Sequence, residues 1–395
     1  MKRLVFTLVF PLLLAGSTLR AGDAATSKAH PAASRLSFAK AITIPTALSQ
    51  PTSIAVGDLS RSGFPALAVV SAAGPGNFPY VSYALGRGNG RFGSWQGAHA
   101  ARAPLFVLLA DATGNRTLDA VTTDVIHNET SIAYGDGKGG FPSYVDINNI
   151  SGAVLAVADV NRDGIPDIVG SGGGPNNVFV ILGEGKKKFG QPTVYPSGGD
   201  NPNGVAVGDL RHNGIRDLVV ANNGALTDGS HASVGVLLGN GDGTFQNPVA
   251  YKAGPRPFAL VLGDFNGDGN LDVAVCGYFG VHVLLGKGDG TFSSAKGYTA
   301  GQNPDWIVAA DFNGDGKLDL AVANDRRYVS VLLGNGDGTF QKPRKFGVGV
   351  APWQLVVADF NHDGRPDIAT VNLGDSTVSV LFNTTKFPTP PRQKH

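Results

Sequence analysis

The sequence has very little glutamate, and this scarcity bears directly on its fold class. Of 31 acidic residues in a chain of 395, only Glu129 and Glu184 are glutamate, and the other 29 are aspartate. Glutamate is a good helix former on exposed faces, whereas aspartate and glycine favour turns and caps. Together with 56 glycines and 24 prolines, this composition argues against helical bundles and α/β folds and indicates an extended, turn-rich chain.

Cysteine and net charge are scarce as well. The single cysteine, Cys276, rules out an internal disulfide framework and a thiolate metal cluster. Its place in the apolar run 273–276 predicts a buried, inert thiol. A net charge of +1 gives no reason to expect nucleic acid or an acidic membrane surface as a partner. At 42% hydrophobic and 16% charged, the chain can bury a core.

Long hydrophobic runs are absent, apart from one short stretch at the N-terminus. Two basic residues precede an apolar run over residues 4–15, and small residues follow it, which is the order of a secretory signal peptide. The run is shorter than the ~20 residues that a spanning helix needs. We therefore predict a signal peptide at 1–22, a flexible linker at 23–37, a disordered tail at 384–395 and secretion to the extracellular or periplasmic space, without a membrane span.

One aspartate-rich phrase recurs along the chain. Residues 263–272 return almost unchanged as residues 310–319, and five further copies, some weaker, follow the same pattern. The first aspartates of the seven copies are Asp58, Asp111, Asp159, Asp209, Asp264, Asp311 and Asp359. They are spaced by about 50 residues on average. Such self-similarity at a fixed period is the signature of a repeat architecture.

Each repeat contains the elements of a four-stranded sheet. Short valine-rich runs enter and leave each aspartate loop, and a second phrase, as in residues 239–245, follows the third run. The polar run that comes after the second phrase is typical of an outer edge strand. Four strands per repeat and seven repeats predict an all-β fold, a seven-bladed β-propeller over residues 38–383.

The two ends of the repeat region predict how the ring closes. The last repeat stops after its third strand, whereas residues 38–44 lie ahead of the first aspartate loop and match the outer-strand position of residues 341–346. We therefore predict that the N-terminal strand completes the last blade. A ring closed in this way leaves no open sheet edge at the seam.

The aspartate loops have the donor pattern of calcium sites. In D-x-[ND]-x-[DN]-G-x-x-D, oxygen-bearing side chains stand at positions 1, 3, 5 and 9, and the glycine at position 6 permits a sharp bend. Hard oxygen ligands are what Ca²⁺ prefers, and no histidine or cysteine is placed to favour zinc or copper. Position 12 holds Val275 or Val322 where an EF-hand needs glutamate. The alternative is a set of Asx-turns without metal.

Four loops carry the complete pattern, so we predict about four Ca²⁺ sites, with the residue at position 7 contributing its backbone carbonyl. The predicted ligands are Asp159, Asn161, Asp163, Ile165 and Asp167; Asp264, Asn266, Asp268, Asn270 and Asp272; Asp311, Asn313, Asp315, Lys317 and Asp319; and Asp359, Asn361, Asp363, Arg365 and Asp367. A weaker site is predicted at Asp209, Asn213 and Asp217, because Arg211 stands at position 3. The first two loops are more degenerate.

These motifs resemble the FG-GAP or VCBS repeat family, whose best-known relatives form the seven-bladed propeller of integrin α subunits. The resemblance covers residues 38–383 and is carried most closely by residues 263–272 and 239–245. It implies calcium binding between the first and second strands of a blade, with ligands often bound on the opposite face. The integrin likeness ends with the propeller.

The sequence leaves the activity open between two classes. Trp306, Trp353, Arg326 and Tyr328 are candidates for a ligand face, because exposed aromatics and arginines make binding hot spots; the alternative is that the tryptophans pack between blades. We expect a monomeric, calcium-binding module for a glycan or an extracellular protein. The second hypothesis is a polysaccharide lyase or hydrolase with its site at the channel mouth, although no G-x-S-x-G, HExxH or phosphate-loop motif is present.

Overall fold

The computed structural model describes residues 35–71, 80–172, 175–225, 229–324 and 326–387. The predicted signal peptide lies outside these residues, as do most of the predicted linker and tail. Every regular element in the described part of the chain is a β-strand, in agreement with the scarcity of helix-forming glutamate.

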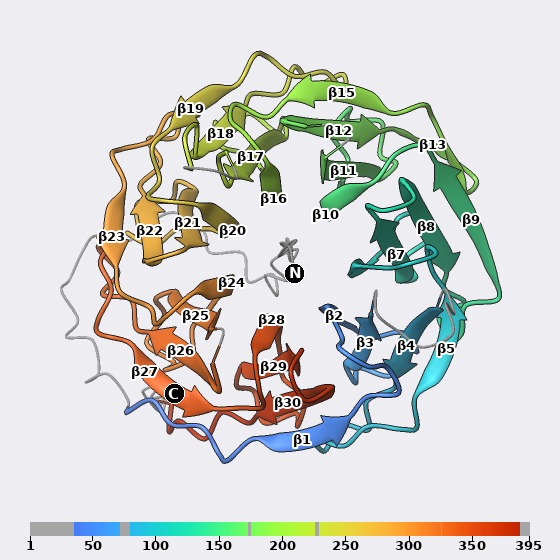
Figure 1. Ribbon diagram of the computed structural model, residues 1–395, viewed down its shortest axis with the longest axis vertical. Coiled ribbons are helices and arrows are strands. Elements are labelled where there is room, and N and C mark those ends of the chain that lie inside the picture. The colour runs from blue at the N-terminus through green and yellow to red at the C-terminus, as the bar shows by residue number, and fades with distance from the viewer. Residues whose placement is uncertain (1–34, 72–79, 173–174, 226–228, 325, 388–395) are drawn as a thin grey trace, which may run out of the picture.

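Seven four-stranded antiparallel sheets stand around a common axis as the blades of a β-propeller (Figure 1). The first four blades, from the ring axis outward, are β2 (Ser53–Gly57), β3 (Ala66–Val70), β4 (Tyr80–Ala84) and β5 (Gln96–His99); β6 (Phe106–Ala110), β7 (Asp119–Asp124), β8 (Glu129–Tyr134) and β9 (Ser143–Asn148); β10 (Gly152–Ala158), β11 (Asp167–Gly172), β12 (Asn177–Ile181) and β15 (Thr193–Pro196); and β16 (Pro202–Gly208), β17 (Asp217–Asn222), β18 (Ser233–Leu237) and β19 (Val249–Tyr251). The remaining blades are β20 (Pro257–Gly263), β21 (Asp272–Gly277), β22 (Gly280–Leu284) and β23 (Lys296–Tyr298); β24 (Pro304–Ala310), β25 (Asp319–Asn324), β26 (Tyr328–Leu332) and β27 (Arg344–Gly347); and β28 (Pro352–Ala358), β29 (Asp367–Asn372), β30 (Thr377–Leu381) and β1 (Ile42–Pro45). A small extra hairpin, β13 (Gly183–Gly185) with β14 (Lys188–Phe189), follows the third strand of the third blade.

The burial of each strand follows its place in the blade. Second strands such as β21 and β25 are buried along their whole length, because they lie between two strands and between two neighbouring blades. Outer strands such as β19 and β27 are largely exposed, which accounts for their polar sequences. The valine-rich runs of the repeat therefore form the core, and the polar run forms the rim.

The ring closes as the sequence predicts. β1 pairs with β30 in an antiparallel register that sets Ile42 opposite Val380, and an isolated bridge joins Phe38 to Asn383. The innermost strands of neighbouring blades contact one another around the whole ring, including β28 against β2. The N-terminal strand thus completes the last blade, and the predicted seven-bladed fold is confirmed.

The second phrase of each repeat is a hairpin whose phenylalanine packs between blades. Isolated bridges close these hairpins, for example between Gly239 and Phe245. The ring of Phe245 meets Tyr195 of the preceding blade edge-on, with centroids 5.5 Å apart, and Phe292 meets Tyr251 in the same way at 5.6 Å. Edge-to-face aromatic pairs add to area burial. The predicted turn and its packing role are both present.

Two proline substitutions test the closure of the ring. The Thr46 N–H donates to the Ser376 carbonyl (3.2 Å), so Thr46 directs its N–H toward β30. Backbone N–H groups alternate in direction along a strand, so Ile44, two residues earlier, also directs its N–H toward β30, whereas Thr43 directs its own away. Ile44→Pro removes a ladder hydrogen bond and is expected to lower the free energy of unfolding by about 1 kcal/mol more than Thr43→Pro does. Urea denaturation measures the difference. The control Ile44→Val keeps the backbone N–H and shows how much stability is lost through side-chain packing alone. Equal effects of the two prolines would contradict this closure.

Candidate functional site

The first aspartate of each loop points into the loop and binds its backbone. In the fifth blade, one oxygen of Asp264 accepts the N–H groups of Gly267 (2.7 Å) and Asp268 (3.2 Å), and the other accepts that of Gly269 (2.9 Å). Asp311 accepts the three corresponding N–H groups of its own loop, and Asp359 accepts those of Asp363 and Gly364. Glycine is favoured at position 6 because the backbone there turns through a positive φ, 87° at Gly269.

The last aspartate of each loop is fully buried and joins the loop to the second hairpin of its blade. Asp272 accepts the N–H of Phe265 on one oxygen and the N–H of Gly286 on the other, both at 2.8 Å. The same pair of contacts recurs in all blades except the first, where Ala66 stands at this position. Hydrogen bonds to a charged acceptor are among the stronger ones in proteins. Position 9 therefore has a structural role in addition to the predicted role as a metal ligand.

Each complete loop holds three aspartate carboxylates, which repel one another. Burial, together with a smaller effect of the nearby carboxylates of Asp268 and Asp264, raises the pKa of Asp272 to about 6. Burial and two loop carboxylates likewise raise the pKa of Asp319 and that of Asp367 to about 7. Like charges at close range disfavour ionisation, so a bound cation would stabilise the ionised form of these groups.

The other oxygens that could bind a metal lie at positions 3, 5 and 7 of the loop, where Asp268 is exposed and Asn266 is partly exposed. The Asn266 amide nitrogen donates to Asp268 (2.9 Å), and the Asp268 carboxylate also accepts the N–H of Asn270 (2.8 Å). Within the described residues, no three His, Cys, Asp or Glu side chains stand together as a ready-made metal cluster. The loops instead offer carboxylate, amide and carbonyl oxygens, which is the hard donor set that suits Ca²⁺.

The fourth blade holds an arginine inside its loop. The guanidinium of Arg211, at position 3, bonds to both oxygens of Asp217 (2.7 and 3.3 Å) and to the carbonyl of Gly239 (2.7 Å). Its side chain is only 18% exposed, and Asp217 is fully buried. A bidentate pair of this kind neutralises a carboxylate directly. The weaker metal site was predicted in this loop, at Asp209, Asn213 and Asp217. Here the guanidinium of Arg211 already supplies positive charge.

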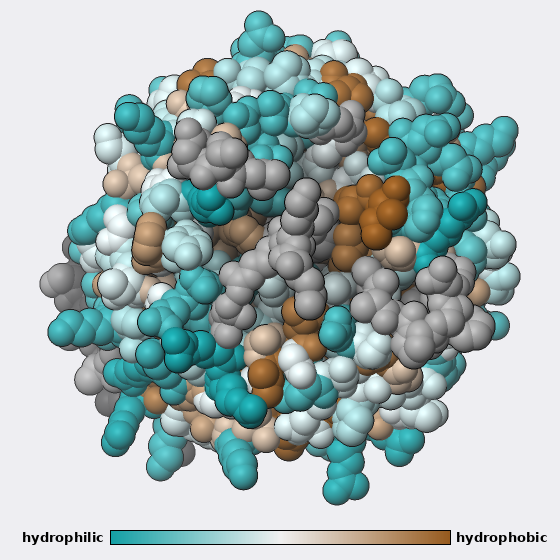
Figure 2. All heavy atoms as spheres, in the orientation of Figure 1, coloured by the Kyte–Doolittle hydropathy of each residue, from teal (hydrophilic) through white to brown (hydrophobic). Residues whose placement is uncertain are grey.

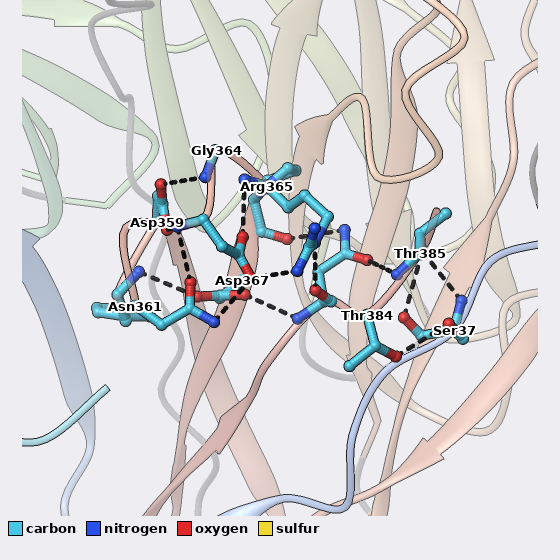
Figure 3. A network of polar contacts seen from close by, with 12 residues as sticks. Ser37, Asp359, Asn361, Gly364, Arg365, Asp367, Thr384 and Thr385 are labelled. Atoms are coloured by element: carbon cyan, nitrogen blue, oxygen red, sulfur yellow. Dashed lines mark hydrogen bonds and ion pairs between the residues drawn. The ribbon is translucent and has the colours of Figure 1, made fainter. Parts of the chain in front are cut away.

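The seventh blade combines a complete loop with an adjacent arginine (Figure 3). Arg365 forms an ion pair with Asp363 and donates to the carbonyl of Asn383 (2.7 Å). Figure 3 shows Asp359, Asn361 and Asp367 gathered beside Arg365, with the Ser37–Thr384 contact farther along the chain. Of the four complete loops, this is the one with an arginine bonded to the position-5 carboxylate.

The first two loops keep their shape with fewer acidic side chains. Asp58 accepts the backbone N–H groups of Ser62 (3.1 Å) and Gly63 (2.6 Å). In the second loop, Arg116 stands where other loops have glycine and adopts a positive φ of 65°. Its backbone N–H donates to Asp111 (2.6 Å). The loop conformation can therefore form around a single aspartate, as the Asx-turn alternative states.

The four residues predicted for a ligand face divide into two groups. Trp306 is fully buried and Trp353 is 7% exposed, so neither indole is a surface group in this structure. Arg326 is exposed and Tyr328 is partly so, with Lys345 above the Tyr328 ring at 4.4 Å. The packing alternative thus describes both tryptophans, since valine-rich strands leave gaps that large rings fill.

Aromatic rings also fill the centre of the ring of blades. Trp306 of β24 stacks with Phe106 of β6, with centroids 6.5 Å apart. These inner strands belong to the sixth and second blades, which are not neighbours, so the contact crosses the ring axis. This packing lies where the channel of the enzyme hypothesis was expected.

The sequence did not indicate one feature of the rim, a groove between the outer strands β5 and β9. Its walls include Trp95, Gln96, His99 and Tyr144, and its volume is about 710 Å³. These residues come from the two most degenerate repeats, and the departures from the repeat are the signal that could have located it. On the face seen in Figure 2, the described hydrophobic side chains form separate patches within a mostly hydrophilic surface.

The aspartate-loop repeats of this chain match a known family model. The family model described as an FG-GAP-like repeat matches residues 159–220, 212–275, 264–322 and 311–370, which together span more than half of the chain. No curated protein sequence matches the chain. Among the described residues there is no helix with the length and apolar character needed to span a bilayer.

Several solved structures share the propeller fold. The BP39L lectin from Burkholderia pseudomallei is 14% identical, with a TM-score of 0.63 over 87% of this chain and 99% of that chain. BBS1N, solved in complex with ARL6DN, is 14% identical, with a TM-score of 0.56 over 89% and 97% of the two chains. The V. cholerae biofilm matrix protein Bap1 is 13% identical, with a TM-score of 0.53 over 89% and 91%. At these identities the likeness concerns the fold alone.

The structural role of position 9 can be separated from metal binding by working in chelator. Asp272→Asn places an amide N–H₂ against one of two buried N–H donors, and is expected to lower the free energy of unfolding by about 1–3 kcal/mol in EGTA. Asp268→Asn, at an exposed position of the same loop, should change it by no more than about 0.5 kcal/mol under the same conditions. Denaturant titration compares the two variants. If Asp272→Asn were as stable as Asp268→Asn in EGTA, position 9 would not have this role.

Proposed function

Because the chain belongs to the FG-GAP-like repeat family, we propose that it is an exported, calcium-stabilised β-propeller that acts as a binding module for a glycan or protein partner. The observation that carries the calcium part is the repeated loop in which buried and exposed carboxylates crowd together with amide and carbonyl oxygens. The observation that supports binding is the aromatic, polar groove at the rim.

Four loops would hold the ions, through the side chains at positions 1, 3, 5 and 9 and the carbonyl at position 7. These are the loops that begin at Asp159, Asp264, Asp311 and Asp359. A bound Ca²⁺ would supply positive charge and cross-link the two strands that flank the loop. The loop at Asp359 should bind more weakly, because Arg365 already neutralises Asp363.

Export supports the calcium proposal on grounds of concentration. The N-terminal pattern of basic residues followed by a short apolar run is typical of a secretory signal. Extracellular modules bind Ca²⁺ with dissociation constants of roughly 10⁻⁴–10⁻³ M. Loops with only three carboxylates are therefore adequate for a protein that works outside the cell.

The binding role has more support than the enzymatic alternative. BP39L is a lectin and Bap1 is a biofilm matrix protein, and both use a propeller of this kind, although the likeness is in fold alone. For the enzyme, the expected location was the channel mouth, where the Trp306–Phe106 stack fills the centre of the ring. We therefore favour a module that binds without chemistry.

Calcium removal tests the stabilising role. Since a ligand of the native state stabilises it by about 2.7 kcal/mol per site at a hundredfold excess over the dissociation constant, EGTA should lower the melting temperature and added Ca²⁺ should restore it. Asp268→Asn should reduce this shift. Asp242→Asn should leave it unchanged, because Asp242 lies in the second phrase and caps the N–H of Thr244 (2.9 Å). An identical melting temperature in EGTA and Ca²⁺ would refute the proposal.

A substitution in the fourth blade tests the donor pattern itself. Arg211→Asn restores an oxygen at position 3 and removes the cation that pairs with buried Asp217. In EGTA the variant should be destabilised by about 3–5 kcal/mol, as expected for a buried charge that has lost its partner. Added Ca²⁺ should recover part of that loss. Arg162→Asn, at an exposed position of the third loop, is the control. A calcium response no larger than that of wild type would show that this loop cannot accept the ion.

A further inference from the structure

The rim groove between the first two blades lies where β5 and β9 follow one another on the right of Figure 1. It is open to solvent, and about 710 Å³ is large enough for one or two sugar rings or a short peptide. None of its lining residues belongs to the aspartate loops, so the groove is a site distinct from the calcium sites.

One wall of the groove is a rigid, exposed aromatic plate. Tyr144 on β9 stacks against His99 on β5, with centroids 3.5 Å apart and ring planes 13° apart. His99 in turn hydrogen-bonds Asp146 through Nε2 (3.0 Å). Although one ring face is covered by His99, Tyr144 is still 54% exposed. Its uncovered face is therefore held in a fixed orientation by contacts from two blades.

Trp95 and Gln96, which also line the groove, are held in place as well. The Trp95 indole N–H donates to the carbonyl of Pro45 (2.9 Å), which anchors a partly exposed ring. Gln96 is exposed, and its carbonyl oxygen accepts the hydroxyl of Tyr83 (3.1 Å). This bond orients the amide and leaves its N–H₂ as a donor for a ligand. The groove thus combines preorganised rings with polar groups, which keeps the entropic cost of binding low.

The polar groups define the charge of a suitable ligand. Asp146 lies beside the groove, behind the lining residue His99; it uses Oδ1 for His99 and has a second oxygen available as an acceptor, with 29% of its side chain exposed. The described residues that line the groove include no lysine or arginine. Asp146 is already paired with His99, and an anionic ligand would find no lysine or arginine in the wall to bind it, so the groove favours a neutral ligand.

From these features we propose that the groove binds a neutral sugar residue of a glycan, with the apolar face of the ring on Tyr144 and the hydroxyls paired with Asp146 and Gln96. This inference rests on the proposed binding function and names its site and ligand class. A sugar matches the groove because it presents an apolar face beside hydroxyls that both donate and accept. The Asp146 carboxylate can accept a hydrogen bond from a sugar hydroxyl, and the Gln96 amide N–H₂ can donate one to a sugar hydroxyl.

A second groove between the fourth and fifth blades lacks this combination. It is smaller, about 510 Å³, and is lined by Tyr251, Lys252 and His282 among others. Burial lowers the pKa of His282, and Gly254 and Gly297 lie so close to its ring that a Cβ at either would contact it. Its histidine is therefore packed into the wall and supports no exposed aromatic plate, so this groove serves as the internal comparison.

The experiment screens the full-length protein on an array of neutral and acidic oligosaccharides and a peptide array, all in Ca²⁺, and then titrates the strongest neutral oligosaccharide from the array. The variants are Tyr144→Ala, Asp146→Asn and Gln96→Ala. Tyr278→Ala is the matched control, because Tyr278 is 49% exposed on a different blade. Melting temperatures verify that each variant is folded, and the exposed Gln96 position supplies a usable variant if Tyr144→Ala is unstable.

Wild type should bind neutral glycans, Tyr144→Ala should bind about tenfold more weakly, and Tyr278→Ala should stay within about twofold of wild type. Equal affinities of Tyr144→Ala, Gln96→Ala and wild type would overturn the groove as the site. Binding of acidic oligosaccharides and of no neutral ones would contradict the proposal that the ligand is a neutral sugar. Binding of peptides and of no glycan would overturn this inference while leaving the binding module intact, whereas binding of neither would overturn the proposed function itself.

Discussion

The buried aspartate at the end of each aspartate loop is the contact on which the rest of this propeller depends. It accepts one N–H from its own loop and one from a residue 14–22 positions later in the chain, as Asp272 does with Phe265 and Gly286. Two hydrogen bonds to a carboxylate are each worth about 1.5–3 kcal/mol. Six of the seven blades have such an aspartate. In five of them it ties the two turns of the blade together, and in the seventh Asp367 binds Asn383, which follows β30.

That arrangement creates an electrostatic problem, which the blades answer in different ways. Burial first, and then repulsion from the two nearby loop carboxylates, disfavours the ionised form of this aspartate and raises the pKa of Asp319. The fourth blade inserts the guanidinium of Arg211, and the seventh places Arg365 beside its loop. For the four complete loops we propose a calcium ion, bound more weakly in the seventh blade, where Arg365 already pairs with Asp363. Metal and guanidinium are then alternative sources of positive charge in one loop shape, and the first blade avoids the problem through Ala66.

Much of the fold could be predicted from the sequence because it is carried by local, repeated patterns. The spacing of the aspartates predicts seven blades, and the match of residues 38–44 to an outer strand predicts the closure, which β1 confirms. The structural role of position 9 could not be predicted, since the second N–H that it binds lies 14–22 residues farther along the chain. Trp306 meets Phe106 across the ring from a position 200 residues away, and no local pattern reports such a contact. The rim groove escaped prediction because it depends on the least regular repeats.

The central claim is that the complete loops are calcium sites, and the most direct measurement is anomalous diffraction from crystals grown with Ca²⁺. The account predicts anomalous peaks inside the loops at residues 159–167, 264–272 and 311–319, a weaker one at 359–367, and none at 209–217, where Arg211 lies. The absence of peaks from all four complete loops would contradict the account, and a peak beside Arg211 would contradict the proposed exchange of metal for guanidinium.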